Sequence, residues 1–128
     1  MKNEMEKKKI CMVDDEADII LLCKMVLEEA GFEVNAFTDS VSALNSFKPS
    51  YYDLIILDIK MPSMDGFELC KKIKELDSKV KVCFLTASEM YYETFRKKEY
   101  CLVDKTLFLR KPIENDDLIK KIREIINT

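Results

Sequence analysis

Three aspartates are the residues of this sequence most able to do chemistry together. Asp14 and Asp15 directly follow one short apolar run, and Asp58 directly follows another. If such carboxylates converge, each pair ~5 Å apart repels by about 3 kcal/mol at an effective dielectric of roughly 20, so the group needs a counter-charge. Oxygen ligands without histidine or cysteine favour a hard cation, and the sequence therefore predicts Mg²⁺ or Mn²⁺ at these aspartates.

A hydroxyl and an ammonium group follow two further apolar runs. Thr86 comes directly after residues 82–85, and Lys111-Pro112 follows residues 107–109 after one intervening residue. A single aspartate after a strand is commonly a helix cap. Capping does not explain an aspartate pair, a third aspartate, a threonine and a lysine that each follow a separate apolar run. We interpret the set as one site in which Lys111 faces the carboxylates.

These side chains can meet only if the apolar runs are strands of one sheet. Most of the runs are apolar throughout, which is typical of parallel strands that helices cover on both faces. Right-handed crossovers then predict a doubly wound α/β fold with five strands and five helices. Ligands of such sheets bind beyond the carboxyl ends of the strands, where the strand order reverses. The predicted strands are residues 10–13, 34–37, 54–57, 82–85 and 107–109.

The predicted helices have recognisable ends. Apolar residues recur with helical spacing between residues 19 and 30, and Gly31 is a typical C-terminal stop. Asp39 or Ser40 can cap a second helix that extends to Phe47. Further helices are expected at residues 67–76 and 118–126, with another between the fourth and fifth strands.

The composition excludes several functional classes. Without histidine, the chain has no Ser-His-Asp triad, no histidine-ligated zinc and no histidine of its own to phosphorylate. Two glycines are too few for a G-x-G-x-x-G loop, and five cysteines without a C-x-x-C pair do not form a zinc ribbon. With 21 basic and 24 acidic residues, the net charge of −3 argues against direct nucleic-acid binding.

The length of 128 residues predicts a single domain. Residues 1–7 read as a charged N-terminal tail and residues 8–128 as the domain. The tail lacks the apolar stretch of a signal peptide, and no run approaches the roughly 20 apolar residues of a membrane span. We therefore expect cytoplasmic localisation without membrane insertion.

Four motifs together resemble a two-component response regulator receiver domain, of the stand-alone, chemotaxis-regulator-like kind. The resemblance extends from about Lys8 to the end of the chain. The motifs are Val-Asp-Asp-Glu at 13–16, Leu-Asp-Ile-Lys-Met-Pro-Ser-Met-Asp-Gly at 57–66, Thr-Ala at 86–87 and Lys-Pro at 111–112. The resemblance implies a flavodoxin-like sheet with strand order 2-1-3-4-5.

The resemblance also implies roles for the site residues. Asp58 is expected to be the phosphoacceptor, with Asp15, Asp58 and the backbone carbonyl of Lys60 as direct Mg²⁺ ligands. Asp14 would act mainly through a metal-bound water. Lys111 would neutralise the transferred phosphoryl group. The chain is then not an enzyme in the ordinary sense, because it catalyses only its own phosphoryl transfer and dephosphorylation.

A switch and its partners follow from the same resemblance. The Thr86 hydroxyl and the backbone N–H of Ala87 would bind the phosphoryl group, and Phe108 occupies the position of the switch aromatic. The phosphodonor would be a sensor histidine kinase or a histidine phosphotransfer protein. The output would be contact with a downstream protein through the fourth helix and fifth strand. The resemblance also implies that the peptide bond between Lys111 and Pro112 is cis.

One segment departs from the family pattern, and alternatives stay open. The stretch from residue 87 to 110 is longer than usual, and its aromatic residues at 91, 92, 95 and 100 fit either a core or an interface. A phosphohydrolase with an aspartate nucleophile favours D-x-D after the first strand, which this chain lacks. A flavin binder needs a phosphate loop there, where Asp14, Asp15 and Glu16 repel phosphate. A pseudo-receiver and a receiver excised from a longer regulator are further alternatives.

Overall fold

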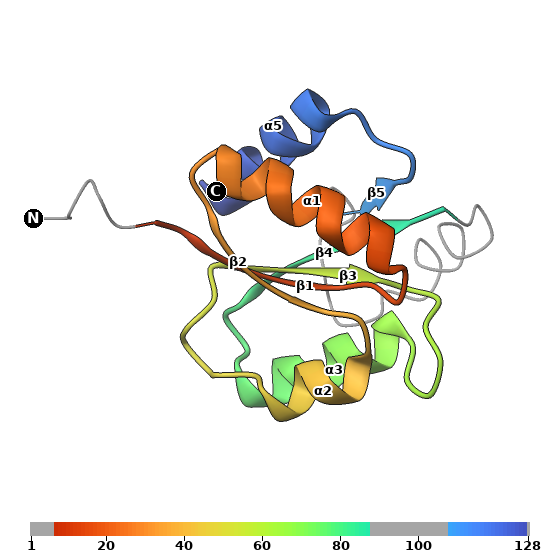
Figure 1. Cartoon of the computed structure of the whole chain (residues 1–128). Coiled ribbons are helices and arrows are strands. Elements are labelled where there is room, and N and C mark those ends of the chain that lie inside the picture. The colour runs from red at the N-terminus through yellow and green to blue at the C-terminus, as the bar shows by residue number, and fades with distance from the viewer. Residues whose placement is uncertain (1–6, 88–107, 128) are drawn as a thin grey trace, which may run out of the picture.

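The computed structural model describes residues 7–87 and 108–127, in which strands alternate with helices (Figure 1). The strands are β1 (Lys9–Val13), β2 (Glu33–Phe37), β3 (Leu54–Asp58), β4 (Lys81–Thr86) and β5 (Phe108–Arg110). The helices are α1 (Ala17–Glu29), α2 (Ser40–Asn45), α3 (Gly66–Leu76) and α5 (Asn115–Ile126). The predicted alternation of strands and helices is confirmed for these residues.

All five strands are parallel and form one sheet with the order β2-β1-β3-β4-β5. The predicted doubly wound α/β fold and its strand order are therefore confirmed. The register pairs Val13 with Leu57, and Asp58 with Leu85. The carboxyl ends of β1, β3 and β4 consequently lie side by side. The strand order reverses between β1 and β3, where such sheets bind ligands.

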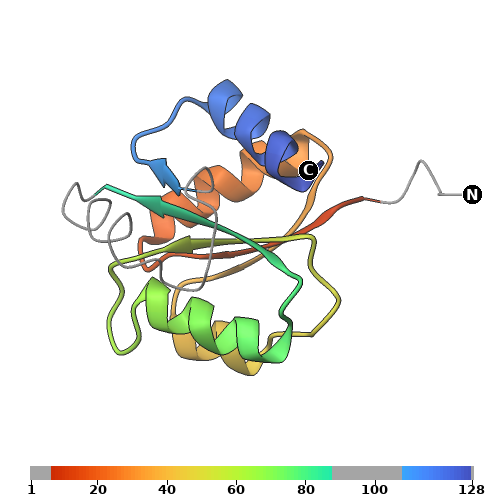
Figure 2. The same cartoon turned by 180° about the vertical axis from the view of Figure 1, so that it is seen from behind.

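Helices cover both faces of the sheet (Figures 1 and 2), with α1 and α5 on one face and α2 and α3 on the other. The central strand β3 contributes to a hydrophobic core on each face. Ile55 and Leu57 belong to the cluster under α2 and α3, whereas Leu54 and Ile56 belong to the cluster under α1 and α5. Among the described helices, none is long and apolar enough to cross a membrane.

The helix α2 is shorter than its apolar spacing predicts. It ends at Asn45, so Phe47 lies outside the helix, although its ring still packs against the core. Pro49 follows two residues later, and a proline disfavours helical backbone at and before its own position. Asp39 is the N-cap, because its side chain accepts a hydrogen bond from the Ser42 N–H at 3.0 Å. Ser40 is the first residue of the helix.

The chain enters and leaves the described fold at one edge of the sheet. β1 begins and α5 ends at the amino edge, where the strands start (Figures 1 and 2). Lys81, at the start of β4, donates from Nζ to the carbonyls of Ile125 at 3.0 Å and Ile126 at 2.9 Å. These contacts bring a positively charged donor to carbonyls in the last turn of the helix, where a cation is favourable. The carboxyl edge lies on the opposite side of the molecule.

Two predictions fall on residues outside the described part of the chain. The predicted fourth helix and the aromatic residues 91, 92, 95 and 100 lie within residues 88–107. Most of the predicted tail lies within residues 1–6. The division into residues 1–7 and 8–128, and the fourth helix, therefore stay predictions.

Candidate functional site

The three predicted carboxylates converge at the carboxyl edge of the sheet. Asp14 follows β1 directly and Asp58 ends β3, and these neighbouring strands bring them together with Asp15. One carboxylate oxygen from each residue lies within 4.8 Å of the other two. Asp14 is 1% exposed and Asp58 is 6% exposed, whereas Asp15 is open to solvent. The sequence prediction of an acidic cluster at this edge agrees with the structure.

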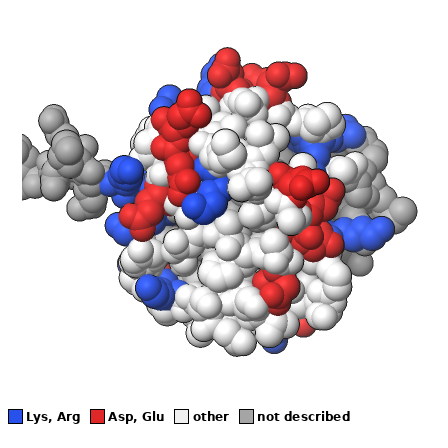
Figure 3. All heavy atoms as spheres, in the orientation of Figure 1, with Lys and Arg blue, Asp and Glu red and all other residues white. Residues whose placement is uncertain are grey.

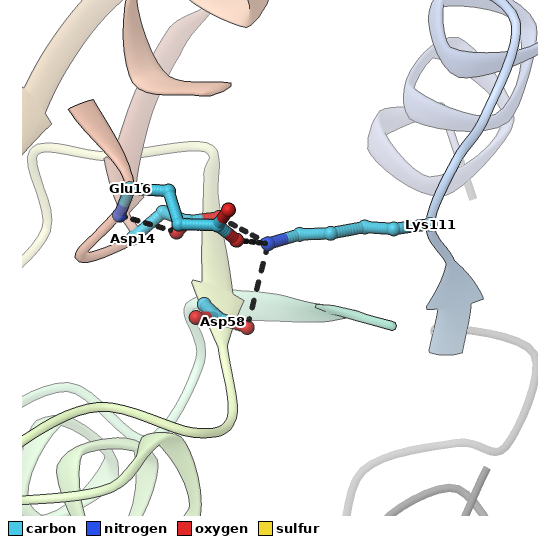
Figure 4. A network of polar contacts seen from close by, with 4 residues as sticks. All are labelled: Asp14, Glu16, Asp58 and Lys111. Carbon is cyan, nitrogen blue, oxygen red and sulfur yellow. Dashed lines mark hydrogen bonds and ion pairs between the residues drawn. The ribbon is translucent and has the colours of Figure 1, made fainter. Parts of the chain in front are cut away.

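Lys111 supplies the positive charge that the cluster needs. Its side chain extends from the segment after β5 toward Asp14, Glu16 and Asp58 (Figure 4). The Nζ atom lies 2.6 Å from Asp14 Oδ2, 3.2 Å from Glu16 Oε1 and 3.6 Å from Asp58 Oδ1. The peptide bond between Lys111 and Pro112 is cis, as the resemblance implied. One ammonium group thus serves several carboxylates.

The shared ammonium group does not fully compensate the carboxylates. Burial raises the pKa of the Asp58 carboxyl to about 7, and the negative charge of Asp14 adds to the rise, although Lys111 opposes it. Burial by itself lowers the pKa of the Lys111 ammonium, but the hydrogen bond and charge of Asp14, together with Asp58 and Glu16, outweigh this effect and raise it above the ordinary value. The site therefore holds Lys111 charged and leaves Asp58 short of positive charge.

A tight loop, residues 59–65, connects β3 to α3 beside the carboxylates. The N–H of Gly66 donates to the Ile59 carbonyl at 2.7 Å, and the side chain of Asp65 caps α3 by accepting from the Glu68 N–H at 2.9 Å. A Cβ atom on Gly66 would lie 2.2 Å from the backbone oxygen of Asp58. Only glycine therefore allows this close approach, which turns the chain back next to Asp58.

An open cleft of about 480 Å³ lies over the carboxylates and extends across the ends of β3 and β4. Its lining residues are Asp15, Glu16, Asp58, Lys60, Met61, Pro62, Thr86, Ala87 and Lys111. A larger hollow of about 760 Å³ lies along α5 and the end of α1. We place the site in the smaller cleft, because the buried carboxylates and Lys111 converge there.

The donor set of the cleft fits a hard divalent cation. The ligands available from Asp14, Asp15 and Asp58 are carboxylate oxygens, and Lys60 lines the same cleft. Mg²⁺ prefers oxygen ligands of this kind and commonly uses one or two carboxylates together with water and phosphate. A cation there would also oppose the burial and the negative charge of Asp14 that together raise the pKa of Asp58. These residues therefore fit the metal that the sequence predicts.

Comparison with known proteins identifies the family. A family model described as response regulator receiver domain matches residues 10–123. The chain belongs to the response regulator receiver domain family. Receiver domains are the phosphoacceptor signalling modules of two-component systems, which confirms the functional class predicted from the four motifs.

The relatives of this receiver domain are sensor and regulator proteins. Sensor protein EvgS of Escherichia coli is 39% identical over 113 residues, which cover 88% of this chain and 9% of EvgS. Response regulator ArlR of Staphylococcus aureus is 30% identical over 117 residues, covering 91% of this chain and 52% of ArlR. The chain thus spans about half or less of the length of these relatives.

A solved structure of a chemotaxis regulator agrees with the fold. Chemotaxis response regulator CheY4 of Vibrio cholerae superposes with a TM-score of 0.80 and 28% sequence identity, covering 94% of this chain and 99% of CheY4. The similarity extends over nearly the whole of both chains. The resemblance to chemotaxis regulators that the sequence suggested is therefore confirmed as a similarity of fold and family.

The structure shows the position of some, but not all, of the predicted switch residues of the receiver domain. Thr86 ends β4, is buried, and lines the cleft with Ala87. The Thr86 carbonyl accepts a hydrogen bond from the Lys111 N–H at 2.8 Å. Phe108 begins β5 and pairs in register with Phe84, but its side chain lies outside the description. The structure thus places Thr86 and Ala87 at the site, and the switch role of Phe108 stays a prediction.

Glu16 joins the site although it was not predicted as a site residue. Its N–H donates to Asp14 Oδ1 at 2.9 Å, and its carboxylate reaches Lys111. The signal in the sequence was its place directly after Asp14 and Asp15. The backbone turns there to begin α1, and Glu16 adds a fourth acidic side chain to the site.

Proposed function

We propose that Asp58 accepts a phosphoryl group from a phosphohistidine of a two-component partner, with Mg²⁺ bound beside it. The observation that carries this proposal is the convergence of the Lys111 ammonium group on the buried carboxylates of Asp14 and Asp58. Buried carboxylates that share one ammonium group cost desolvation energy that their pairing does not fully repay, which favours a role other than stability. Here the cleft above the carboxylates is open to a partner and to a phosphoryl group.

The chemical step is attack of an Asp58 carboxylate oxygen on phosphorus. A bond forms between that oxygen and phosphorus, and the bond between phosphorus and the imidazole nitrogen of the donor breaks. The imidazole nitrogen keeps the electron pair and takes up a proton, and Asp58 becomes an acyl phosphate. The attacking group must be ionised. In the metal-free chain the pKa of about 7 leaves part of Asp58 protonated at neutral pH, and a cation bound beside it would favour the ionised form.

Lys111 can stabilise negative charge at the site both before and after this step. Its Nζ atom lies 2.6 Å from Asp14 but 3.6 Å from Asp58, so in the unphosphorylated structure it hydrogen-bonds mainly to Asp14. Transfer places about 1.5 to 2 negative charges on Asp58. The long, flexible lysine side chain can then bind a phosphoryl oxygen, and the ammonium charge stabilises it.

The metal site is proposed to use Asp15, Asp58 and the backbone carbonyl of Lys60 as direct ligands. Asp14 would contact the cation mainly through water. A bound Mg²⁺ or Mn²⁺ would supply positive charge to the oxygens of the transferring phosphoryl group. The acidic cluster and the place of Lys60 in the same cleft support this assignment.

The phosphodonor is proposed to be a sensor histidine kinase or a histidine phosphotransfer protein that docks against α1. Leu21, Leu22 and Met25 of this helix are more than half exposed. Figure 3 shows a broad uncharged area across the face that carries α1, with acidic groups on either side. Leu22 and Cys23 also line an apolar pocket of about 330 Å³ that reaches Lys111. Such a surface beside the cleft supports docking of a protein rather than only a small phosphodonor.

The output is proposed to be a change in protein contacts. The Thr86 hydroxyl and the Ala87 N–H would bind the phosphoryl group, and Phe108 would respond by repacking. Binding at the cleft can bias a distant surface only if an element has two arrangements. We propose that the fourth helix and β5 form that surface, that no direct nucleic-acid contact is made, and that the chain has no catalytic activity beyond its own phosphorylation and dephosphorylation. Cytoplasmic localisation stays a prediction.

Intact-mass measurement after incubation with Mg²⁺ and acetyl phosphate tests the proposal. The wild-type chain should gain one phosphoryl group, and Asp58→Asn should gain none, because an amide is not a competent nucleophile. Asp116→Asn, an exposed position on α5, is the matched control and should label like the wild type. Equal labelling of Asp58→Asn and wild type would overturn the assignment of Asp58.

A further inference from the structure

The loop that carries Lys60 is fastened to α2 by one buried hydroxyl group. Ser40, at the start of α2, is 1% exposed, and its Oγ donates to the backbone carbonyl of Met64 at 2.9 Å. The two residues are 24 positions apart in the chain. The chemistry assigned to the cleft makes no use of Ser40. Its hydrogen bond therefore calls for a separate explanation.

The loop depends on contacts from outside itself to keep its shape. Ser63 has a φ of 71°, in the left-handed region that side chains other than glycine rarely adopt. The next residue, Met64, donates its N–H to the Pro62 carbonyl at 2.7 Å, which closes a very tight turn. Strained backbone of this kind persists where the surroundings hold it. The Ser40 hydroxyl acts directly on this turn.

The same loop determines where the Lys60 carbonyl lies relative to Asp58. Its base is closed by the hydrogen bond from Gly66 to Ile59, and Lys60 follows Ile59 directly. The loop of residues 59–65 is therefore closed at its base by the hydrogen bond between Gly66 and Ile59, and is held to α2 at Met64, near the start of α3, by Ser40. A shift at either contact would move the carbonyl that lies between them.

We propose that Ser40 is a positioning residue of the metal site: it fixes the Met64 carbonyl, and through this loop sets the place of the Lys60 carbonyl against Asp15 and Asp58. The inference rests on the proposed function, because it takes Lys60 as a ligand. Mg²⁺ demands near-ideal octahedral geometry, whereas Ca²⁺ accepts irregular ligand arrangements. Loss of the Ser40 hydroxyl should accordingly weaken Mg²⁺ binding more than Ca²⁺ binding.

Calorimetric titration of the full chain with Mg²⁺ alone, and separately with Ca²⁺ alone, tests this proposal. Ser40→Ala should weaken Mg²⁺ binding about tenfold, at the lower end of the 10–100-fold losses typical when a direct partner of a ligand is removed, because Ser40 contacts Met64 and not Lys60 itself. Its Ca²⁺ affinity should fall by less than about threefold. Ser46→Ala removes an exposed hydroxyl from the other end of α2 and should leave both affinities unchanged.

A second variant keeps the test decisive if Ser40→Ala folds poorly. Ser40→Thr retains the hydroxyl and should restore the Mg²⁺ affinity to within about threefold of wild type, whereas Ser40→Cys offers only a weak donor and should not. Wild-type Mg²⁺ affinity in Ser40→Ala, or equal losses of Mg²⁺ and Ca²⁺ affinity, would overturn the role of Ser40 and leave the proposed function standing. A wild-type chain that does not bind Mg²⁺ would instead overturn the proposed function itself.

Discussion

At the amino edge of the sheet two acidic groups, Asp53 and Glu33, each meet a donor of their own, whereas at the carboxyl edge three carboxylates share one lysine. Asp53, just before β3, accepts from the Lys9 N–H at 2.8 Å, and the Asp53 N–H donates to the Lys9 carbonyl at 2.8 Å. The Tyr51 hydroxyl donates to Glu33 at 3.0 Å. These pairs join the starts of β1, β2 and β3.

The carboxyl edge uses the same kinds of residue without this pairing. Lys111 is divided among Asp14, Glu16 and Asp58, and the pKa of Asp58 rises to about 7. Because both edges belong to the same strands, the difference does not come from the fold. We infer that the paired groups at the amino edge stabilise the fold. The clustered carboxylates at the carboxyl edge destabilise it, but they provide the negative charge that can bind a cation and accept a phosphoryl group.

The largest expected effect comes from breaking the carboxyl edge at Gly66. In Gly66→Ala the new Cβ atom meets the Asp58 backbone oxygen at 2.2 Å and Ile59 Cα at 2.9 Å, so the backbone must shift. We expect a loss of about 3 kcal/mol in the free energy of unfolding, together with loss of Mg²⁺ binding.

Gly31→Ala is the control for this substitution. It meets no atom within 4 Å, and its φ of 102° costs about 1 kcal/mol. Urea denaturation and Mg²⁺ titration measure both effects, and a harmless Gly66→Ala would contradict the close approach.

Substitutions of one aspartate at each edge should have opposite signs. In the presence of chelator at pH 7, Asp58→Asn removes a repelled charge and should raise the free energy of unfolding by about 1–3 kcal/mol. Asp53→Ala removes a paired acceptor and should lower the free energy of unfolding by about 1 kcal/mol.

Mg²⁺ should raise the melting temperature of the wild type more than that of Asp58→Asn. A less stable Asp58→Asn would show that the carboxylates do not repel one another.

The stabilisation by Asp58→Asn should depend on pH. The pKa of Asp58 in the folded chain is about 7, above the ordinary value of 3.8, so between these pH values the folded chain holds a proton that the unfolded chain has released. Raising the pH through this interval therefore destabilises the wild type, by at most about 1.4 kcal/mol per pH unit for one proton. The asparagine variant lacks this titration. Without metal, its advantage should be small near pH 4 and level off above pH 7, as urea denaturation at several pH values can establish. An advantage that is constant from pH 4 to pH 8 would contradict the raised pKa.

The smallest effect should come from the amino edge. Lys81→Met keeps the aliphatic stem but removes the ammonium group that caps the carbonyls of Ile125 and Ile126. We expect a loss of about 0.5–1 kcal/mol in the free energy of unfolding. The Mg²⁺ affinity should stay that of wild type, because the two edges are independent. Weaker Mg²⁺ binding by Lys81→Met would show that the two edges are coupled.

The sequence predicted the strands and the acidic cluster well because both follow from local patterns. Apolar runs that end in Asp14 and Asp58 indicate buried strands with polar carboxyl ends. The contact of Ser40 with Met64 could not be predicted from the sequence. A serine at the start of a helix is typical of an N-cap, but in the structure Asp39 is the N-cap, and the Ser40 hydroxyl instead donates to a residue 24 positions away. Phe47 was placed in the helix because its packing follows the helical spacing even after α2 has ended. The side chain of Phe108 lies outside the described residues, so its predicted switch role stays a prediction.

The contact of Lys81 with the end of α5 has a practical consequence for handling the protein. It holds the last turn of α5 at the edge where β1 also starts, across the molecule from the carboxyl end of β3 (Figure 1). A fluorophore or surface linker attached near the start of β1 or in the last turn of α5 would therefore lie away from the cleft. Protein immobilised through either position should keep the cleft free for a phosphodonor.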